Sequence, residues 1–148
     1  MPNNIAIGHY PSLCFFEGTS VSVGRGTDAP FQQIGHPDYN GTHSFTPRSG
    51  PGAKYPKLEN KLCYGKDLTK TSPNLDRLDL SYLIEFYKDL ESKGKPFFSD
   101  SNFFDLLAGT DKLKKMIRKG MPENEIRMYW EPELLEYRIM MKKYKLYE

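Results

Sequence analysis

Glu17 and Arg25 are the residues of this 148-residue chain whose types and spacing best suit chemistry. Both lie in the stretch CFFEGTSVSVGRGTD, residues 14–28, which also carries several hydroxyl side chains. A glutamate can transfer a proton or accept hydrogen bonds, and the planar fork of an arginine binds a carboxylate, a phosphate or a sugar oxygen. This combination predicts a site for a polar, oxygen-rich ligand.

The elements that position these two side chains are predicted to be a strand and a glycine turn. Apolar and β-branched residues between positions 13 and 23 suit a half-buried strand, and Glu17 lies where the apolar run is interrupted. A strand would fix the backbone of Glu17, while the following loop leaves its side chain accessible. Gly24 and Gly26 permit a tight turn, or a close approach to a ligand, around Arg25. The simplest alternative is a β-hairpin in which Glu17 and Arg25 only form an ion pair.

The composition predicts one globular domain and gives no sign of a nucleic-acid partner. Hydrophobic residues make up 38% of the chain and aromatic residues 14%, which is enough for a core rich in rings. The formal charge of +2 is too small to indicate nucleic-acid binding, and the basic runs at 112–119 and 138–145 suit solvated helix faces. No apolar stretch approaches the roughly 20 residues that span a bilayer, and the first eleven residues lack the features of a signal peptide.

The cysteines and histidines predict no metal site and no cofactor. The chain has two cysteines, Cys14 and Cys63, without a CxxC motif, and no histidine at metal-ligand spacing. Two interpretations of the cysteines stay open: a disulfide worth up to about 4 kcal/mol in an oxidising compartment, or two buried free thiols. His9, His36 and His43 are expected in surface or capping roles.

The order of the expected elements favours an α+β fold, with short strands and long loops first and four to five helices afterwards. Residues 1–10 are expected to be a linker, strands are expected at 30–35 and 62–65, and the Gly- and Pro-rich segment 39–61 is expected to be a long loop that forms one wall of a cleft. Helical periodicity and stop signals predict helices over residues 80–92, 101–109, 110–120 and 122–130, and a last helix that begins at Pro132.

We expect the helices to cover the strands through one buried apolar cluster. Helical spacing assigns the following residues to it: Leu83, Ile84, Phe103, Phe104, Leu107 and Trp130.

The motif residues resemble the C-terminal domain of a bacterial enzyme family. The residues that carry the resemblance are Cys14 to Thr19, Ser22 to Thr27, Pro30-Phe31, Ile34-Gly35, Cys63 to Gly65, the helix from Leu80 to Tyr87, Phe103 to Asp105, Leu107 to Gly109, Ile117, Gly120, Ile126, Trp130, Arg138 and Tyr144 to Tyr147. The family was formerly called domain of unknown function 1343, and its characterised members are exo-β-N-acetylmuramidases of the NamZ type in glycoside hydrolase family 171. The resemblance covers nearly the whole chain from Pro11 onward.

The resemblance implies a domain that is normally the second of two. Family proteins resemble two-domain enzymes in which an N-terminal Rossmann-like domain supplies most catalytic carboxylates. By this resemblance, residues 1–10 are a linker remnant, residues 11–148 are the C-terminal domain, and the Rossmann-like domain is a partner absent from this chain. The implied substrates are peptidoglycan-derived muramic acid sugars handled in cell wall recycling, and the implied location of the full-length protein is periplasmic or secreted.

The resemblance also implies that the FEGT and GRGT segments face an interdomain cleft. It makes Glu17 the candidate catalytic residue, and Thr19, Arg25 and Thr27 candidate substrate-binding residues. Glycoside hydrolysis ordinarily needs two carboxyl groups about 5 to 9.5 Å apart. No convincing second carboxyl group is evident among Asp28, Asp38 and Asp105, which suit capping and surface roles. Whether Glu17 is the acid, the base or an orienting group stays open.

Two functions from different classes are therefore considered. The first is the C-terminal part of a peptidoglycan-directed glycoside hydrolase that releases terminal N-acetylmuramic acid and forms one wall of an interdomain active site. The isolated chain would then be inactive and would expose an apolar and aromatic patch beside Glu17 and Arg25. The second is a stand-alone, non-catalytic module that binds carbohydrate or another protein.

Overall fold

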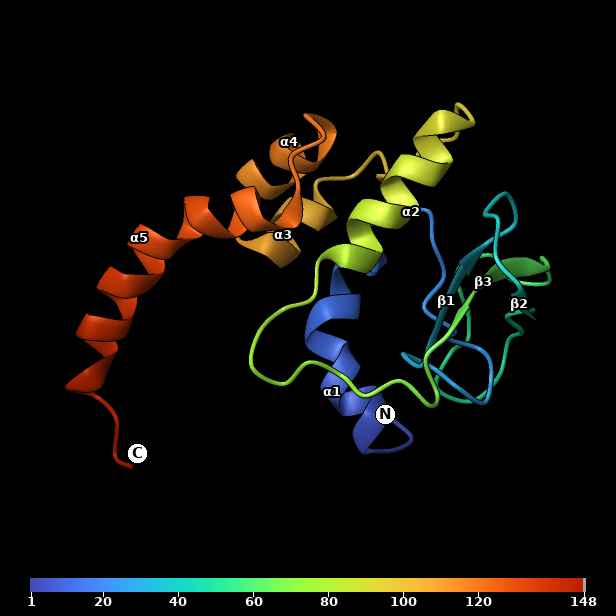
Figure 1. The fold of residues 1–148 in the computed structure, drawn as a ribbon. Coiled ribbons are helices and arrows are strands. Elements are labelled where there is room, and N and C mark those ends of the chain that lie inside the picture. Colours follow the sequence, from blue (N-terminus) through green and yellow to red (C-terminus); the bar gives the residue numbers. More distant parts are fainter. Residues whose placement is uncertain (148) are drawn as a thin grey trace.

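The computed structural model describes residues 1–147. They fold into helices and a small sheet that are joined by loops (Figure 1). In chain order the elements are α1 (Asn4–Leu13), the 3₁₀ helix η1 (Cys14–Gly18), β1 (Gln33–His36), β2 (His43–Phe45), β3 (Cys63–Asp67), α2 (Ser81–Ser92), α3 (Phe103–Ala108), α4 (Lys112–Arg118) and α5 (Glu123–Lys142). Figure 1 shows the sheet on one side of α1 and α2 and the helices α3 to α5 on the other. The α+β prediction is confirmed.

The sheet has the order β1-β3-β2, and both pairings are antiparallel. Its centre is glycine: Gly35 of β1 and His43 of β2 both lie opposite Gly65 of β3. A Cβ atom at Gly65 would lie 1.8 Å from the carbonyl oxygen of Ile34, so only glycine permits this approach of the strands. The two strands expected from the sequence are therefore present with shifted ends, and β2 lies inside the expected long loop.

The strand predicted between residues 13 and 23 is wrong, and most of the segment expected to be a linker, residues 1–10, is helical. Asn3 caps α1 by accepting a hydrogen bond from the backbone N–H of Ala6 at 3.0 Å, and η1 follows directly. The apolar run in this region is too short for its period to separate a strand from buried helix. Only isolated bridges, such as Ser22 with Gly35, give the residues after η1 a strand-like pairing.

Aromatic rings build the core between η1, α2 and α3. Phe16, Phe86 and Phe104 are fully buried. Phe16 meets Phe86 edge-to-face with ring centroids 5.7 Å apart, and Phe98 meets Phe104 in the same way at 4.8 Å. Phe15 of η1 also meets Phe104 of α3, with ring centroids 6.0 Å apart, so η1, which carries Glu17, packs against both α2 and α3.

The predicted apolar cluster is confirmed for five of its six members. Leu83 and Phe104 are fully buried, whereas Ile84, Leu107 and Trp130 are partly buried and pack against the core. Phe103 is 43% exposed, so its assignment to the cluster is wrong. Adjacent helical residues point about 100° apart, so α3 can turn only one of the neighbours Phe103 and Phe104 inward.

The pair Phe103 and Phe104 provides a matched test of the core. Phe104→Ala is expected to lower the free energy of unfolding by about 3–5 kcal/mol, because it leaves a cavity among buried rings. Phe103→Ala is expected to cost less than about 1 kcal/mol, because that ring is already half in water. Urea unfolding of the two variants measures the difference, and equal losses would contradict this account of α3.

Two proline predictions differ in outcome. Pro122 lies at the start of α5 as expected, but Pro132 lies inside the helix and does not begin a new one. Pro132 cannot donate a hydrogen bond to the carbonyl group of Met128, and the exposure of Met128 leaves that carbonyl group close to water. One helix therefore runs through both predicted segments. No helix within residues 1–147 is long and apolar enough to cross a membrane.

Both cysteines are free thiols in the structure, which answers the question that the sequence left open. Cys63 is fully buried on β3, and burial raises the pKa of its thiol to about 11. Cys14 is partly buried, and its thiol donates a hydrogen bond to the carbonyl oxygen of Pro11 at 3.3 Å. Within residues 1–147, no group of three or more Asp, Glu, His or Cys side chains is arranged to hold a metal ion.

The histidines take structural positions. His9 is buried, contrary to expectation, with Nε2 3.0 Å from the carbonyl oxygen of Thr71. His36 is also buried, yet its Nδ1 accepts a hydrogen bond from the backbone N–H of Asp38 at 3.1 Å, which is a capping role. His43 is partly exposed on β2.

Candidate functional site

Two glycines shape the turn that presents Arg25. Gly24 has φ +75° and Gly26 has φ +83°, a backbone region that other residues rarely adopt. A Cβ atom would lie 2.6 Å from the side chain of Gln33 at the first position and 2.5 Å from the carbonyl oxygen of Arg48 at the second. The predicted tight glycine turn is therefore confirmed, and it holds Arg25 at the surface.

Glu17 lies on η1, immediately before a glycine that packs on α3. A Cβ atom at Gly18 would lie 2.5 Å from Cα of Phe104, so glycine lets the two helices touch through their backbones. Nη1 of Arg25 donates a hydrogen bond to Oε1 of Glu17 at 3.2 Å. The two side chains are 48% and 24% exposed, respectively, so the pair is open to solvent. The structure thus forms the expected ion pair, but between a 3₁₀ helix and a turn and not across a hairpin.

Lys57 is a member of this site that the sequence did not indicate. Its ammonium group donates hydrogen bonds to the carbonyl oxygens of Phe16 at 2.9 Å and Glu17 at 3.3 Å, and also to that of Thr19. These carbonyl groups lie where η1 ends; that of Phe16 also accepts from the backbone N–H and the hydroxyl group of Thr19, so Lys57 matters most for those of Glu17 and Thr19. Burial lowers the pKa of Lys57 to about 8, although the negative charge of Glu17 opposes that shift. Lys57 therefore holds the turn that carries Glu17.

The two candidate threonines make internal hydrogen bonds. Thr19 is buried, and its hydroxyl group donates to the carbonyl oxygen of Phe16 at 2.8 Å and accepts from the backbone N–H of Val21 at 3.1 Å. Thr27 donates to the carbonyl oxygen of Gly24 at 2.6 Å, closing the glycine turn. The structure therefore brings Glu17 and Arg25 together, whereas the hydroxyl group of Thr19 points into the protein.

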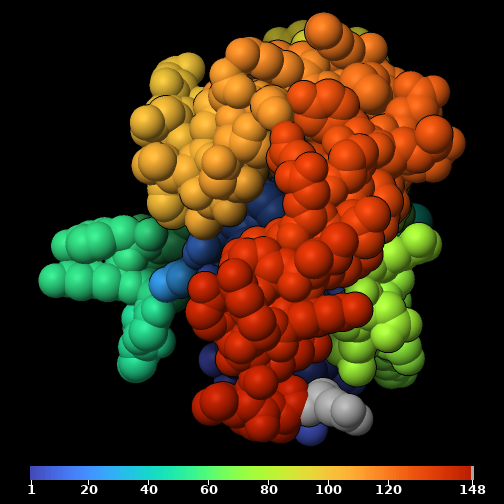
Figure 2. Space-filling model, turned by 90° about the vertical axis from the view of Figure 1, so that its left-hand side faces the viewer, coloured from blue at the N-terminus to red at the C-terminus, as the bar shows by residue number. Residues whose placement is uncertain are grey.

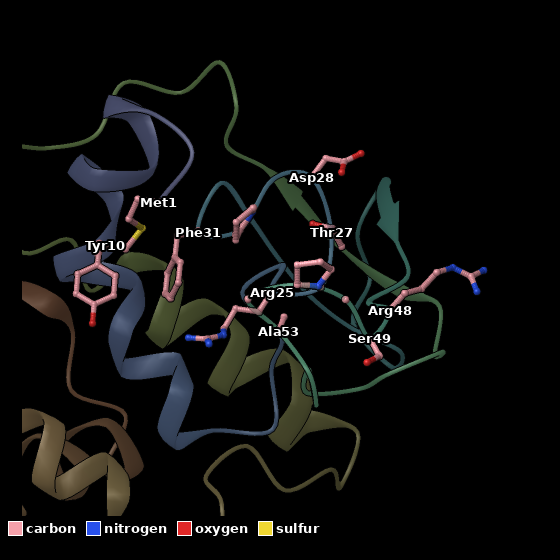
Figure 3. Close-up of a pocket in the computed structure, with 14 residues that line it drawn as sticks. Met1, Tyr10, Arg25, Thr27, Asp28, Phe31, Arg48, Ser49 and Ala53 are labelled. Carbon is pink, nitrogen blue, oxygen red and sulfur yellow. The ribbon is translucent and has the colours of Figure 1, made fainter.

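Arg25 separates two cavities. The smaller cavity, about 360 Å³, is lined by Glu17, Val21, Ser22, Val23, Arg25, Tyr55, Pro56, Lys57 and Phe103. The larger, about 590 Å³, is lined by Arg25, Gly26, Thr27, Asp28, the loop from Arg48 to Ala53, and Met1, Tyr10, Pro30 and Phe31. Figure 3 shows Arg25 extending toward Phe31 in the larger cavity, while the side chain of Arg48 extends in the opposite direction.

Aromatic side chains are exposed beside the ion pair, in agreement with the patch expected there from the sequence. Tyr55 is 81% exposed and Phe103 is 43% exposed, and both line the smaller cavity with Glu17 and Arg25. This placement gives Phe103 a surface position in place of its predicted core position.

Glu17 is the only carboxylate among the described residues that line the smaller cavity. Asp28 is exposed on the larger cavity. Asp38 pairs with Lys95 at 3.4 Å, and Asp105 pairs with Lys114 at 3.6 Å. The structure therefore presents one carboxylate and one guanidinium in an open cavity. A glycosidase ordinarily uses two carboxyl groups, so this cavity holds one of the two.

Comparison with known proteins identifies the family of this domain. The chain belongs to the family described as exo-beta-N-acetylmuramidase NamZ, C-terminal, which matches residues 9–147. This confirms the resemblance stated from the motif residues.

Individual relatives agree with this assignment. Peptidoglycan beta-N-acetylmuramidase NamZ of Bacillus subtilis (strain 168) is 30% identical over an alignment 159 positions long that covers 93% of this chain and 36% of the relative. A crystal structure of a DUF1343 family protein from Bacteroides fragilis NCTC 9343 is 46% identical with a TM-score of 0.90, over 99% of this chain and 42% of that one. A second such protein from the same organism, 16% identical with a TM-score of 0.68 over 100% of this chain and 45% of that one, shares the fold. The chain thus spans less than half the length of each relative.

Proposed function

We propose that this domain forms one wall of the active-site cleft in a two-domain exo-β-N-acetylmuramidase that releases terminal N-acetylmuramic acid from peptidoglycan fragments. The observation that supports this most is the Glu17–Arg25 pair in an open cavity with a single carboxylate. Because glycoside hydrolysis uses two carboxyl groups, the second would come from the region that precedes this domain, which we propose to be Rossmann-like.

Each candidate residue receives a role that agrees with its contacts. Glu17 takes part in proton transfer or orients the group that does. Arg25 uses Nη1 for Glu17 and is 48% exposed, so much of its fork is accessible to the lactyl carboxylate that distinguishes muramic acid from glucosamine. Thr27 contributes to the cavity wall, and the buried Thr19 acts as a positioning residue beneath the turn.

The test of this proposal is the substrate preference of Arg25→Lys in the complete two-domain enzyme. Lysine keeps the charge but loses the bidentate fork. We expect kcat/KM for a chromogenic muramic acid glycoside to fall about 10- to 100-fold, the size of one charge-assisted hydrogen bond. The matched glucosamine glycoside, which lacks the lactyl group, should lose much less.

Arg77→Lys, at an exposed position of the loop before α2, is the control and should leave both values unchanged. Equal losses on the two substrates would show that Arg25 does not recognise the lactyl carboxylate.

A further inference from the structure

The second half of α5 carries apolar side chains that lie in solvent. Every residue from 131 to 140 is exposed. Leu134 is 40% exposed, Tyr137 54% and Ile139 62%. Figure 1 shows this half of the helix extending away from the other elements, and Figure 2, which views it from the front, shows it as a ridge that runs to the lower end of the molecule. A surface helix normally buries its apolar face, so this face lacks its covering.

One apolar row continues from the core onto this uncovered half. Ile126, Trp130, Leu134, Tyr137 and Met141 follow one another at intervals of three or four residues and therefore share a helix face. Ile126 is fully buried, and Trp130 packs against the core. The helix face that packs on the core at the start of α5 is thus the same face that is uncovered in its second half.

A further apolar row lies on the opposite side of the helix. Met128 is 73% exposed, Leu135 54% and Ile139 62%, and their spacing of seven and four residues aligns them. A helix with apolar residues on two sides fits a groove better than a flat surface.

The uncovered half of α5 would gain stability from such a groove. Isolated helices shorter than about 12–15 residues are marginal in water, because nucleation costs more than a few hydrogen bonds return. Pro132 removes one of those hydrogen bonds. Packing against another surface is the usual source of helix stability, and within residues 1–147 this half has only the exposed ion pair of Glu133 with Lys112 at 3.3 Å.

The lengths of the relatives indicate what occupies this surface. The family describes a C-terminal region, and this chain covers 36% of the Bacillus relative, so most of that relative precedes the matched part. The match to the longer Bacteroides chain, with a TM-score of 0.90 over 99% of this chain, is extensive enough to include α5. Figures 1 and 2 place the first residues and the end of α5 at the same end of the molecule. In the proposed two-domain protein, the preceding region would join this domain at that end of the molecule.

We propose that residues 131–147 form a docking arm that lies in an apolar groove of the region preceding this domain in the two-domain protein. The proposal rests on the two-domain organisation of the proposed function, but not on the catalytic roles given to Glu17 and Arg25. Four basic residues line the last part of the arm: Arg138, Lys142, Lys143 and Lys145. The rim of the groove is therefore expected to carry Asp or Glu side chains at that end.

Amide hydrogen exchange compares the 148-residue chain with the complete protein. In the chain alone, the amides of residues 133–142 should exchange almost as fast as unprotected amides. In the complete protein, the same amides should exchange at least 100-fold more slowly. The double variant Leu134→Glu with Tyr137→Glu should remove this added protection in the complete protein, while Glu136→Gln, on another side of the helix, should keep it. The amides of α2 serve as the internal control for an intact fold.

Each other result would overturn the proposal. Equal exchange in the chain and the complete protein would mean that the preceding region does not cover the arm. Protection in the chain alone that increases with protein concentration would mean that a second copy covers it. Protection unaffected by the double variant while α2 stays protected would place the contact elsewhere. The exchange measurement does not depend on enzymatic activity. A complete protein that shows no hydrolysis but protects residues 133–142 would therefore contradict the catalytic proposal and support this one.

Discussion

Glu17→Gln in the complete two-domain enzyme is expected to lower kcat for a muramic acid glycoside by about 10²- to 10⁴-fold. Glutamine keeps the shape of the side chain and can still accept a hydrogen bond from Arg25, but it cannot take up or release the proton that glycoside cleavage requires. Steady-state rates of wild type and variant, measured across the pH range, give the decrease in kcat. They also show whether one limb of the pH–rate profile disappears. A loss nearer 10-fold with an unchanged pH profile would make Glu17 an orienting group.

The matched control is Glu91→Gln at an exposed position near the end of α2, which should leave kcat unchanged. The 148-residue chain alone should show no measurable hydrolysis, because its cavity holds one carboxylate. Robust turnover by this chain, abolished by Glu17→Gln, would show that both catalytic groups lie within it. Unchanged turnover of the complete enzyme after the substitution would remove Glu17 from the reaction and favour the non-catalytic binding module as the role of this domain.

Lys57→Met is expected to lower the free energy of unfolding by about 2–4 kcal/mol at pH 7. The thioether fills similar space but cannot donate, so the carbonyl groups of Glu17 and Thr19 lose this donor, while that of Phe16 keeps its two bonds from Thr19. Urea unfolding of the chain measures this loss. Lys70→Met, at an exposed position, is the control and should cost less than about 0.5 kcal/mol.

The pH dependence of the same variant tests the electrostatics of Lys57. The pKa of Lys57 is about 8 in the folded protein and 10.5 as its ordinary value. Between these values the unfolded chain binds more protons than the folded one, so stability contributed by Lys57 increases as pH rises from 8 toward 10.5. The stability gap between wild type and Lys57→Met should widen by about 2–3 kcal/mol between pH 7 and pH 10. A gap that narrows over this range would mean that the carbonyl groups favour the ammonium form more than burial disfavours it.

The sequence predicted local features of the site better than long-range ones. The glycine turn and the Glu17–Arg25 pair depend on residues close together in the chain, and both are present. The contact of Lys57 with η1 joins residues about forty positions apart, and no pattern around Lys57 distinguishes it from other loop lysines. Tertiary packing, which the sequence pattern does not contain, made that lysine part of the site.

The errors at the two ends of the chain have a common cause. Gly8 and Pro11 both disfavour a helix at the start of the chain, yet α1 contains both. Gly8 is needed there, because a Cβ atom would lie 2.4 Å from the side chain of Pro73. Pro132 likewise argued for a break in what is one helix. Residues that discourage helices in isolation are tolerated where packing or solvent compensates for them.

The loop between β2 and β3 is anchored to the rest of the domain near both ends, whereas its tip is held by local hydrogen bonds, such as the two between the backbones of Gly50 and Ala53. The backbone N–H of Arg48 binds the carbonyl oxygen of Gly26 at 2.8 Å, and Lys57 holds η1, whereas Gly50 and Gly52 face open space. Insertions and substitutions at this tip would reshape the larger cavity without moving Glu17 or Arg25. Natural sequence variation within the family should therefore concentrate between Arg48 and Lys57. Changes there can alter which ligands the cavity accepts while the Glu17–Arg25 ion pair is kept.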